Sequence, residues 1–151
     1  MKLQMKQLSC KSFAKLNLCL HIINRRNDGY HELQGIFHVV DLHDTIIFKM
    51  NEGDDINLQT NVKNLLNEDN LIYKACRVLS QKYKLNIGLD IILKKKIPLG
   101  SGLGGGSSNA AVTLHAINKL YDIQLSKSEL ISVADKLGSD VPFFIDGGKA
   151  Y

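Results

Sequence analysis

Apolar residues recur at nearly every second position in two long stretches of the chain, residues 8–23 and 35–50. The side chains of a strand point alternately to its two faces, so this alternation predicts two strands. Polar residues interrupt the second stretch near 42–44, where we expect the strand to be bent or broken. Two shorter apolar runs, 55–60 and 89–95, predict two further strands.

A helical period replaces this alternation elsewhere in the chain. Residues 67–83 carry apolar side chains three or four positions apart, which predicts an amphipathic helix. A further helix is expected at 126–136, because Ser126 and Glu129 have the spacing of a capping box. The residues after Gly147 predict the beginning of another strand. Between the helices predicted at 67–83 and 126–136, a third helix is expected. Its apolar face is formed by Ala110, Leu114, Ile117 and Tyr121.

The most distinctive stretch is PLGSGLGGGSSNAA, residues 98–111, between a predicted strand and a predicted helix. Glycines adopt positive φ and let backbone N–H groups approach a ligand closely, and a following helix adds unpaired donors and the positive end of its dipole. Ser107, Ser108 and Asn109 suit a helix start, and their side chains can reach a phosphate or its cation. We predict a phosphate-binding loop; a flexible linker is disfavoured, since linkers are rarely framed by a strand and a patterned helix.

Three common nucleotide motifs do not fit this context. A P-loop needs lysine followed by serine or threonine at the helix start, whereas Gly106 is followed by two serines. The spacing Gly100-x-Gly102-x-x-Gly105 matches the dinucleotide fingerprint, but Asp122, where a ribose-binding acid is expected, follows a helix and not a strand. The glycine loop of protein kinases accompanies His-Arg-Asp and Asp-Phe-Gly motifs, which this sequence lacks.

Composition indicates one globular domain over residues 1–151. The net charge of +4 mildly favours anionic ligands, but 19 basic and 15 acidic residues are well mixed, unlike a nucleic-acid-binding surface. There is no apolar run of the roughly 20 residues that a membrane helix needs, and no signal-peptide core. Three cysteines without a CxxC pair fit a reducing compartment. We expect a cytoplasmic protein without nucleic-acid or membrane partners.

Several polar residues are candidates for chemistry. Lys15 and Asn17, two positions apart, share one face of the first strand, which is either solvated or functional. Tyr30 and His31 end a turn-rich loop, a place where binding residues are often found. Asp140 lies in a predicted loop beside an apolar pair of phenylalanines.

Four motifs, in this order and spacing, resemble the superfamily of galactokinase, homoserine, mevalonate and phosphomevalonate kinases. They are FAKLNLCL, RRNDGYHEL, GSGLGGGSSNAA and LGSDVPFF. The glycine motif alone indicates the superfamily. GYH and SDVPFF resemble the members that phosphorylate 4-diphosphocytidyl-2-C-methyl-D-erythritol in non-mevalonate isoprenoid precursor biosynthesis. The resemblance extends from about Ser12 to Tyr151.

This resemblance implies an α+β fold, that of the ribosomal-protein-S5-like N-terminal domain of these kinases. It also implies transfer of the γ-phosphoryl group of ATP, with Mg²⁺, to the 2-hydroxyl of the cytidylated substrate. Asp140 matches the family's catalytic aspartate and Lys15 its partner lysine. Asn17, Tyr30 and His31 match positions that hold the substrate.

The implied ATP site is centred on the glycine motif. The lysine run 94–96 is of a kind usually solvated, yet beside a phosphate loop it can also attract a nucleotide. Mg²⁺ is expected near Ser107 or Ser108. The residues implied to bind ATP are Asn70, Leu71, Lys96, Pro98, Leu99, Gly100, Ser101, Gly102, Leu103, Gly104, Gly105, Gly106, Ser107 and Ser108.

Members of this family are nearly twice as long as this chain, so the resemblance implies an N-terminal domain whose C-terminal partner is absent. We expect the 151 residues alone to be inactive. Two alternatives remain at this point. One is a different small-molecule kinase of the superfamily, and the other is a non-catalytic nucleotide- or RNA-binding module with the same fold.

Overall fold

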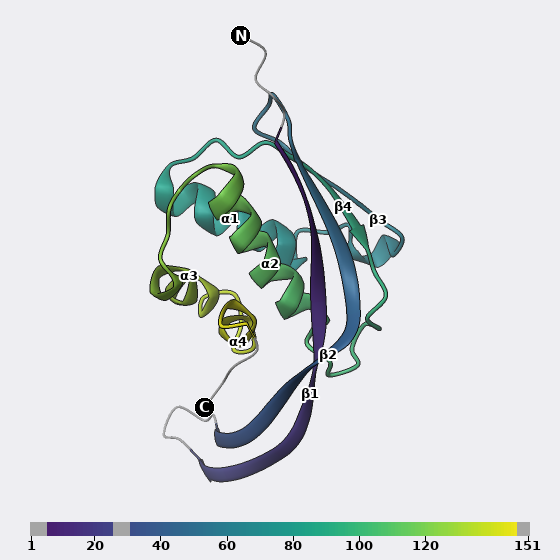
Figure 1. Cartoon of the computed structure of the whole chain (residues 1–151), viewed down its shortest axis with the longest axis vertical. Helices are drawn as coiled ribbons and strands as arrows, with labels where there is room; N and C mark the ends of the chain where they lie inside the picture. Colours follow the sequence, from purple (N-terminus) through teal and green to yellow (C-terminus); the bar gives the residue numbers. More distant parts are fainter. Residues whose placement is uncertain (1–5, 26–30, 148–151) are drawn as a thin grey trace.

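The computed structural model describes the backbone of residues 6–25 and 31–147, and the side chains of residues 6–19 and 35–147. One four-stranded sheet carries the helices on one face (Figure 1). This arrangement confirms the predicted α+β class. The elements in chain order are β1 (Gln7–Arg25), β2 (His31–Met50), β3 (Ile56–Thr60), a 3₁₀ turn η1 (Lys63–Leu65), α1 (Leu71–Tyr83), β4 (Leu89–Lys94), α2 (Gly105–Leu120), α3 (Lys127–Ala134) and α4 (Val141–Ile145).

The strands lie in the order β1-β2-β4-β3. β2 pairs antiparallel with both β1 and β4, whereas β3 and β4 are parallel and are connected through α1. A parallel pair needs such a crossover because its two strands run in the same direction. The β1–β2 hairpin is long, with strands of 19 and 20 residues, and one end projects beyond the helices (Figure 1).

β2 bends at the position that its polar interruption predicted, but it is not broken. Phe13 of β1 pairs with His43, and the next residue, Ala14, pairs with Val40. Residues 41–42 therefore have no partner across the ladder and form a β-bulge, which bends a strand without ending it.

The core lies between the sheet and the helices. On β4, Leu89, Ile91 and Leu93 alternate inward and are at most 1% exposed, and the apolar run had predicted the strand itself. Burying a side chain of this size stabilises the fold by about 1.5–3 kcal/mol relative to leaving it exposed. Other fully buried residues of this core lie on the neighbouring strand β2 (Ile46 and Phe48), on α1 (Ile72 and Leu79) and on α2 (Leu114 and Ile117).

Two helix boundaries differ from the prediction. α1 begins at Leu71 and not at residue 67, because Asn70 caps it: its Oδ1 accepts a hydrogen bond from the Ile72 N–H at 2.9 Å. α3 has the predicted capping box but ends at Ala134, two residues early.

One helix was missed altogether. The five residues of α4 follow Asp140 directly, so the predicted loop there is only partly a loop. The strand predicted after Gly147 lies outside the described part of the chain, which ends at that residue.

Candidate active site

The glycine-rich segment connects β4 to α2. Gly100, Gly102 and Gly104 have φ values of 65°, 74° and 70°, and Gly105 and Gly106 open α2. Residues with a Cβ rarely adopt such positive φ values, so the backbone itself requires the glycines of the first half of this motif.

Two of the glycines are also needed for close packing. A Cβ on Gly104 would lie 2.9 Å from Phe144 Cζ and 3.1 Å from Lys15 Cγ. On Gly105 it would lie 2.9 Å from the Nζ of Lys95. Separations below 3 Å are steric clashes, so larger residues here would displace the loop or its neighbours.

The start of α2 provides an anion-binding environment. The described first turn of α2 contains no acidic side chain, and its N-cap, Gly104, contributes no side-chain hydrogen bond. The first N–H groups of a helix have no intrahelical partner and lie at the positive end of its dipole. This turn borders a cavity of about 420 Å³, lined by Leu65, Asp69, Asn70, Leu71, Lys95, Pro98, Leu99, Gly100, Ser101, Gly102, Leu103, Gly104, Gly105, Gly106, Ser107, Asn109 and Asp140.

An ion pair lies at the same cavity. The Nζ of Lys15 is 3.0 Å from Oδ2 of Asp140, although 125 residues separate them in the chain. The Lys15 side chain is 3% exposed, whereas that of Asp140 is 41% exposed. The backbone N–H of Lys15 also donates to the carbonyl of Leu103 at 2.9 Å, which connects β1 directly to the glycine segment. A carboxylate open to the cavity is thus held by a buried ammonium group.

Lys15 has two further contacts that compensate its burial. Its Nζ donates to Asn17 Oδ1 at 3.1 Å and lies 4.0 Å from the centroid of the Phe37 ring. A desolvated cation is stabilised by such hydrogen bonds and by the face of an aromatic ring. The interpretation of this strand face as solvated is therefore wrong for Lys15. It holds for Asn17, which is exposed.

The structure brings together most of the residues implied to bind ATP. Asn70, Leu71, Pro98 and the run 99–107 all line the cavity. Ser107 borders it, whereas Ser108 is buried and its hydroxyl accepts a hydrogen bond from Ser12 at 2.8 Å.

Other predicted residues are placed differently. Lys96 has an exposed side chain that does not line the cavity; its neighbour Lys95 does. Tyr30 lies outside the described residues, and of His31 only the backbone, at the start of β2, is described.

A family model with the description GHMP kinases N terminal domain matches residues 70–148 of this chain. The match includes the glycine segment, α2 and Asp140. The chain belongs to the GHMP kinases.

Among relatives of this GHMP kinase chain is a protein of Francisella tularensis subsp. novicida (strain U112), named 4-diphosphocytidyl-2-C-methyl-D-erythritol kinase. It is 51% identical over 141 residues, which cover 93% of this chain and 51% of the relative. A protein with the same name from Prochlorococcus marinus (strain MIT 9515) is 50% identical over 149 residues, 97% of this chain and 48% of its own. This chain therefore spans about half the length of the curated relatives that it matches.

Solved structures have the same fold as this chain. A crystal structure of 4-(cytidine 5'-diphospho)-2C-methyl-D-erythritol kinase superposes with a TM-score of 0.81 at 36% identity, covering 93% of this chain and 49% of that one. A mevalonate kinase superposes with a TM-score of 0.63 at 22% identity, covering 95% of this chain and 48% of that one, and shows the shared fold.

Sequence reasoning missed a buried polar cluster of this GHMP kinase beneath the cavity. Asp44 is fully buried, and its Oδ2 lies 2.7 Å from the Nζ of Lys95, which is also buried. Strand periodicity could have located both. Lys95 continues the inward series of β4 beyond Leu93, and Asp44 precedes the inward residue Ile46 by two positions on β2. The sequence prediction instead grouped Lys95 with Lys94 and Lys96, as a run that is either solvated or able to attract a nucleotide.

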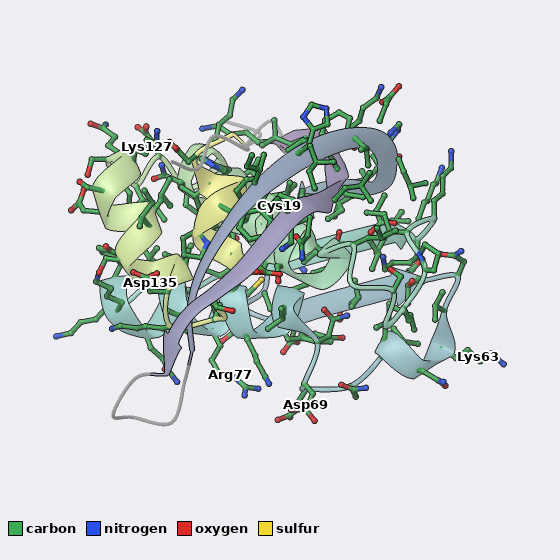
Figure 2. The ribbon with its side chains drawn as sticks, turned by 90° about the horizontal axis from the view of Figure 1, so that it is seen from below. Cys19, Lys63, Asp69, Arg77, Lys127 and Asp135 are labelled. Atoms are coloured by element: carbon green, nitrogen blue, oxygen red, sulfur yellow. The ribbon has the colours of Figure 1, made fainter. Side chains whose placement is uncertain are left out.

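Within the described part of the chain, no helix is both long enough and apolar enough to cross a membrane. In the same residues, no group of three histidine, cysteine or acidic side chains is placed to hold a metal ion. Charged side chains of both signs, among them Lys63, Asp69, Arg77, Lys127 and Asp135, occur on several elements (Figure 2). This mixture does not favour the RNA-binding alternative, which requires a concentrated basic surface.

Proposed function

We propose that the complete protein is an ATP-dependent kinase that phosphorylates the 2-hydroxyl of 4-diphosphocytidyl-2-C-methyl-D-erythritol, in isoprenoid precursor biosynthesis. The observation that carries this proposal is the Lys15–Asp140 pair, 3.0 Å apart, at the cavity that the glycine segment lines. The names of relatives at about 50% identity support the choice of substrate.

In this proposal the glycine segment binds the triphosphate of ATP. Its positive-φ glycines carry no side chain that could cover the backbone N–H groups, and the start of α2 adds donors and a favourable dipole. Asn70 and Leu71, at the start of α1, line the same cavity and are assigned to the adenine end. The Asn70 side chain already caps α1 and donates to the Leu65 carbonyl at 2.9 Å. We therefore assign it van der Waals contact with the adenine and not a hydrogen bond.

Asp140 and Lys15 are assigned to the transfer step. The substrate hydroxyl oxygen attacks the γ-phosphorus, the bond from that phosphorus to the bridging oxygen of ADP breaks, and the hydroxyl proton passes to the Asp140 carboxylate. Lys15 orients that carboxylate through their contact at 3.0 Å. Because the ammonium is buried, its charge is screened little by solvent and also offsets negative charge on the transferring group.

The lining residues fit a magnesium ion bound with ATP. Ser107 and Asp140 contribute hydroxyl and carboxylate oxygens to the cavity, and these hard ligands are the kind Mg²⁺ takes beside substrate phosphates. Such an ion neutralises charge on the β- and γ-phosphates.

We assign the cytidine end of the acceptor to Asn17, Tyr30 and His31. Asn17 is exposed and contacts Lys15, so it connects the acceptor side to the transfer site. A tyrosine ring offers a stacking face worth about 1–3 kcal/mol per base, and a histidine offers hydrogen bonds to the base edge. We also place the protein in the cytoplasm, a proposal that the three free cysteines of the described structure support.

The experiment that tests this function is ATP turnover by the full-length gene product with three separate acceptors. We expect phosphorylation of 4-diphosphocytidyl-2-C-methyl-D-erythritol, and little with mevalonate or homoserine. Preference for mevalonate or homoserine would indicate a different small-molecule kinase. ATP binding without turnover of any acceptor would support the non-catalytic alternative.

A further inference from the structure

The carboxylate of Asp44 is fully buried and accepts hydrogen bonds from several segments of the chain. Its Oδ1 accepts from the backbone N–H groups of Lys96, at 2.7 Å, and Ile97, at 2.8 Å. Its Oδ2 accepts from the Lys95 Nζ at 2.7 Å. The Asn109 amide, oriented so that its nitrogen faces oxygen acceptors, donates to the same Oδ2 at 3.0 Å.

These partners lie on both sides of the glycines, which fall within residues 100–106. Lys95–Ile97 leads from β4 towards them, and Asn109 belongs to the first turns of α2, three residues after Gly106. The Asn109 amide also donates to the carbonyl of Gly105 at 3.1 Å. One carboxylate therefore connects the entry and the exit of the loop to β2.

Lys95 extends this connection to the cavity wall. Its Nζ donates to the carbonyl of Ile97 at 2.7 Å and lies where a Cβ on Gly105 would approach within 2.9 Å. The ammonium thus packs against Gly105, the first residue of α2. Lys95 lines the cavity, whereas Asp44 does not.

A buried ion pair adds little net stability over apolar residues, because desolvation of both charges offsets most of their attraction. Apolar residues of similar size would fill this space without a desolvation penalty, but they could not accept hydrogen bonds from the Lys96 and Ile97 N–H groups. The geometry points to a requirement for a fixed loop backbone.

We propose that Asp44 is a positioning residue that holds the two ends of the glycine segment at the spacing needed to bind a triphosphate. The ATP part of this inference rests on the proposed function, whereas the effect on the loop backbone does not.

The test uses the full-length gene product and the variant Asp44→Asn. In the free protein, hydrogen exchange of the amides of residues 95–109 should become about tenfold faster, the change expected on losing a hydrogen bond to a charged group. Exchange within α1, residues 71–83, should change much less. The dissociation constant of ATP should rise by a similar factor, while KM for the cytidylated acceptor stays within about twofold.

A matched control is Asp90→Asn on β4. The Asp90 carboxylate also accepts two side-chain hydrogen bonds, from Asn51 and Asn57, but it lies at the far end of that strand. This control should change neither loop exchange nor ATP affinity.

A second variant distinguishes an effect on the loop backbone from a general loss of stability. Asp44→Leu combined with Lys95→Met replaces the ion pair by apolar groups, which often leaves stability unchanged or higher. Its melting temperature should recover towards wild type, while exchange at residues 95–109 stays fast, since the Lys96 and Ile97 N–H groups still lack an acceptor.

Unchanged loop exchange in Asp44→Asn would overturn the proposal, and so would an acceleration spread equally over α1 and the loop. If loop exchange responds as described but the wild-type protein does not bind ATP, the positioning role stands and the kinase assignment fails.

Discussion

Gly105 has no room for a side chain, and this makes it a sensitive probe of the loop. Gly105→Ala would place a Cβ 2.9 Å from both Lys95 Nζ and Ile97 Cγ2, so either the start of α2 or these two side chains must shift. Overpacking of this kind costs about 1–3 kcal/mol, and we expect ATP affinity to fall at least tenfold, roughly 1.4 kcal/mol. Isothermal titration of the full-length protein with ATP measures the change.

The control for this prediction is Gly53→Ala in a distant turn. Its Cβ would approach Asn51 Oδ1 only to 3.6 Å, an ordinary contact, so ATP affinity should stay unchanged. Equal affinities for wild type and Gly105→Ala would show that triphosphate does not bind at this end of α2.

Single residues also show where prediction from the sequence reaches its limit. The glycine motif allowed the loop to be predicted, because glycine is the residue that fits positions with positive φ or with no room for a Cβ. Lys15 was ambiguous, since alternation places a side chain on a face but does not say what covers that face. Its burial depends on Phe37 and Asp140, which only the fold brings near. For Asp44, periodicity indicates the inward face of β2, but it does not show the partners, which come from the residues after β4 and from α2.

At the scale of elements, α3 offers a pH-dependent test of its capping box. The Ser126 hydroxyl and N–H donate to Glu129 Oε2 at 2.7 and 2.8 Å, and these bonds lower the pKa of the Glu129 carboxyl from its ordinary 4.5. A lowered folded-state pKa gives a stabilisation that is complete above about pH 4.5 and is lost as pH falls through the lower value.

We therefore expect Glu129→Gln to speed hydrogen exchange in α3 relative to wild type at pH 7, with the difference shrinking towards pH 3. Ser126→Ala should move the pKa of Glu129 back towards 4.5 in a carboxyl NMR titration. A pKa that does not move in this variant would mean that the Ser126 hydroxyl does not cause the shift.

The elements themselves were predictable in proportion to their length and periodicity. The long strands β1 and β2, and helices α1 and α2, each contain enough repeats for the pattern to identify them. The five-residue α4 is too short to show a helical period, and a proline near its start reads equally well as a loop. The bulge in β2 was visible as a polar interruption, but its size follows from pairing with β1, which depends on tertiary structure.

At the scale of the whole molecule, the described residues leave the candidate site open to solvent. Asp140 is 41% exposed and Leu99 is 50% exposed. Electrostatic contacts in water are several times weaker than in an enclosed site. We expect the 151 residues of the printed sequence, taken alone, to bind ATP weakly and to show no measurable kinase turnover beside the full-length product. Comparable turnover rates from the two would show that this half is sufficient for catalysis.

The central claim is that Asp140, held by Lys15, accepts the proton of the attacking hydroxyl. The most direct measurement is the single-turnover rate of Asp140→Asn in the full-length protein, with ATP and the cytidylated acceptor both saturating. General-base catalysis contributes about 10²–10⁴-fold, so the rate should fall by that factor while the dissociation constant of ATP changes less than about twofold. A rate near that of wild type would contradict the account, because it would leave Asp140 without a part in phosphoryl transfer.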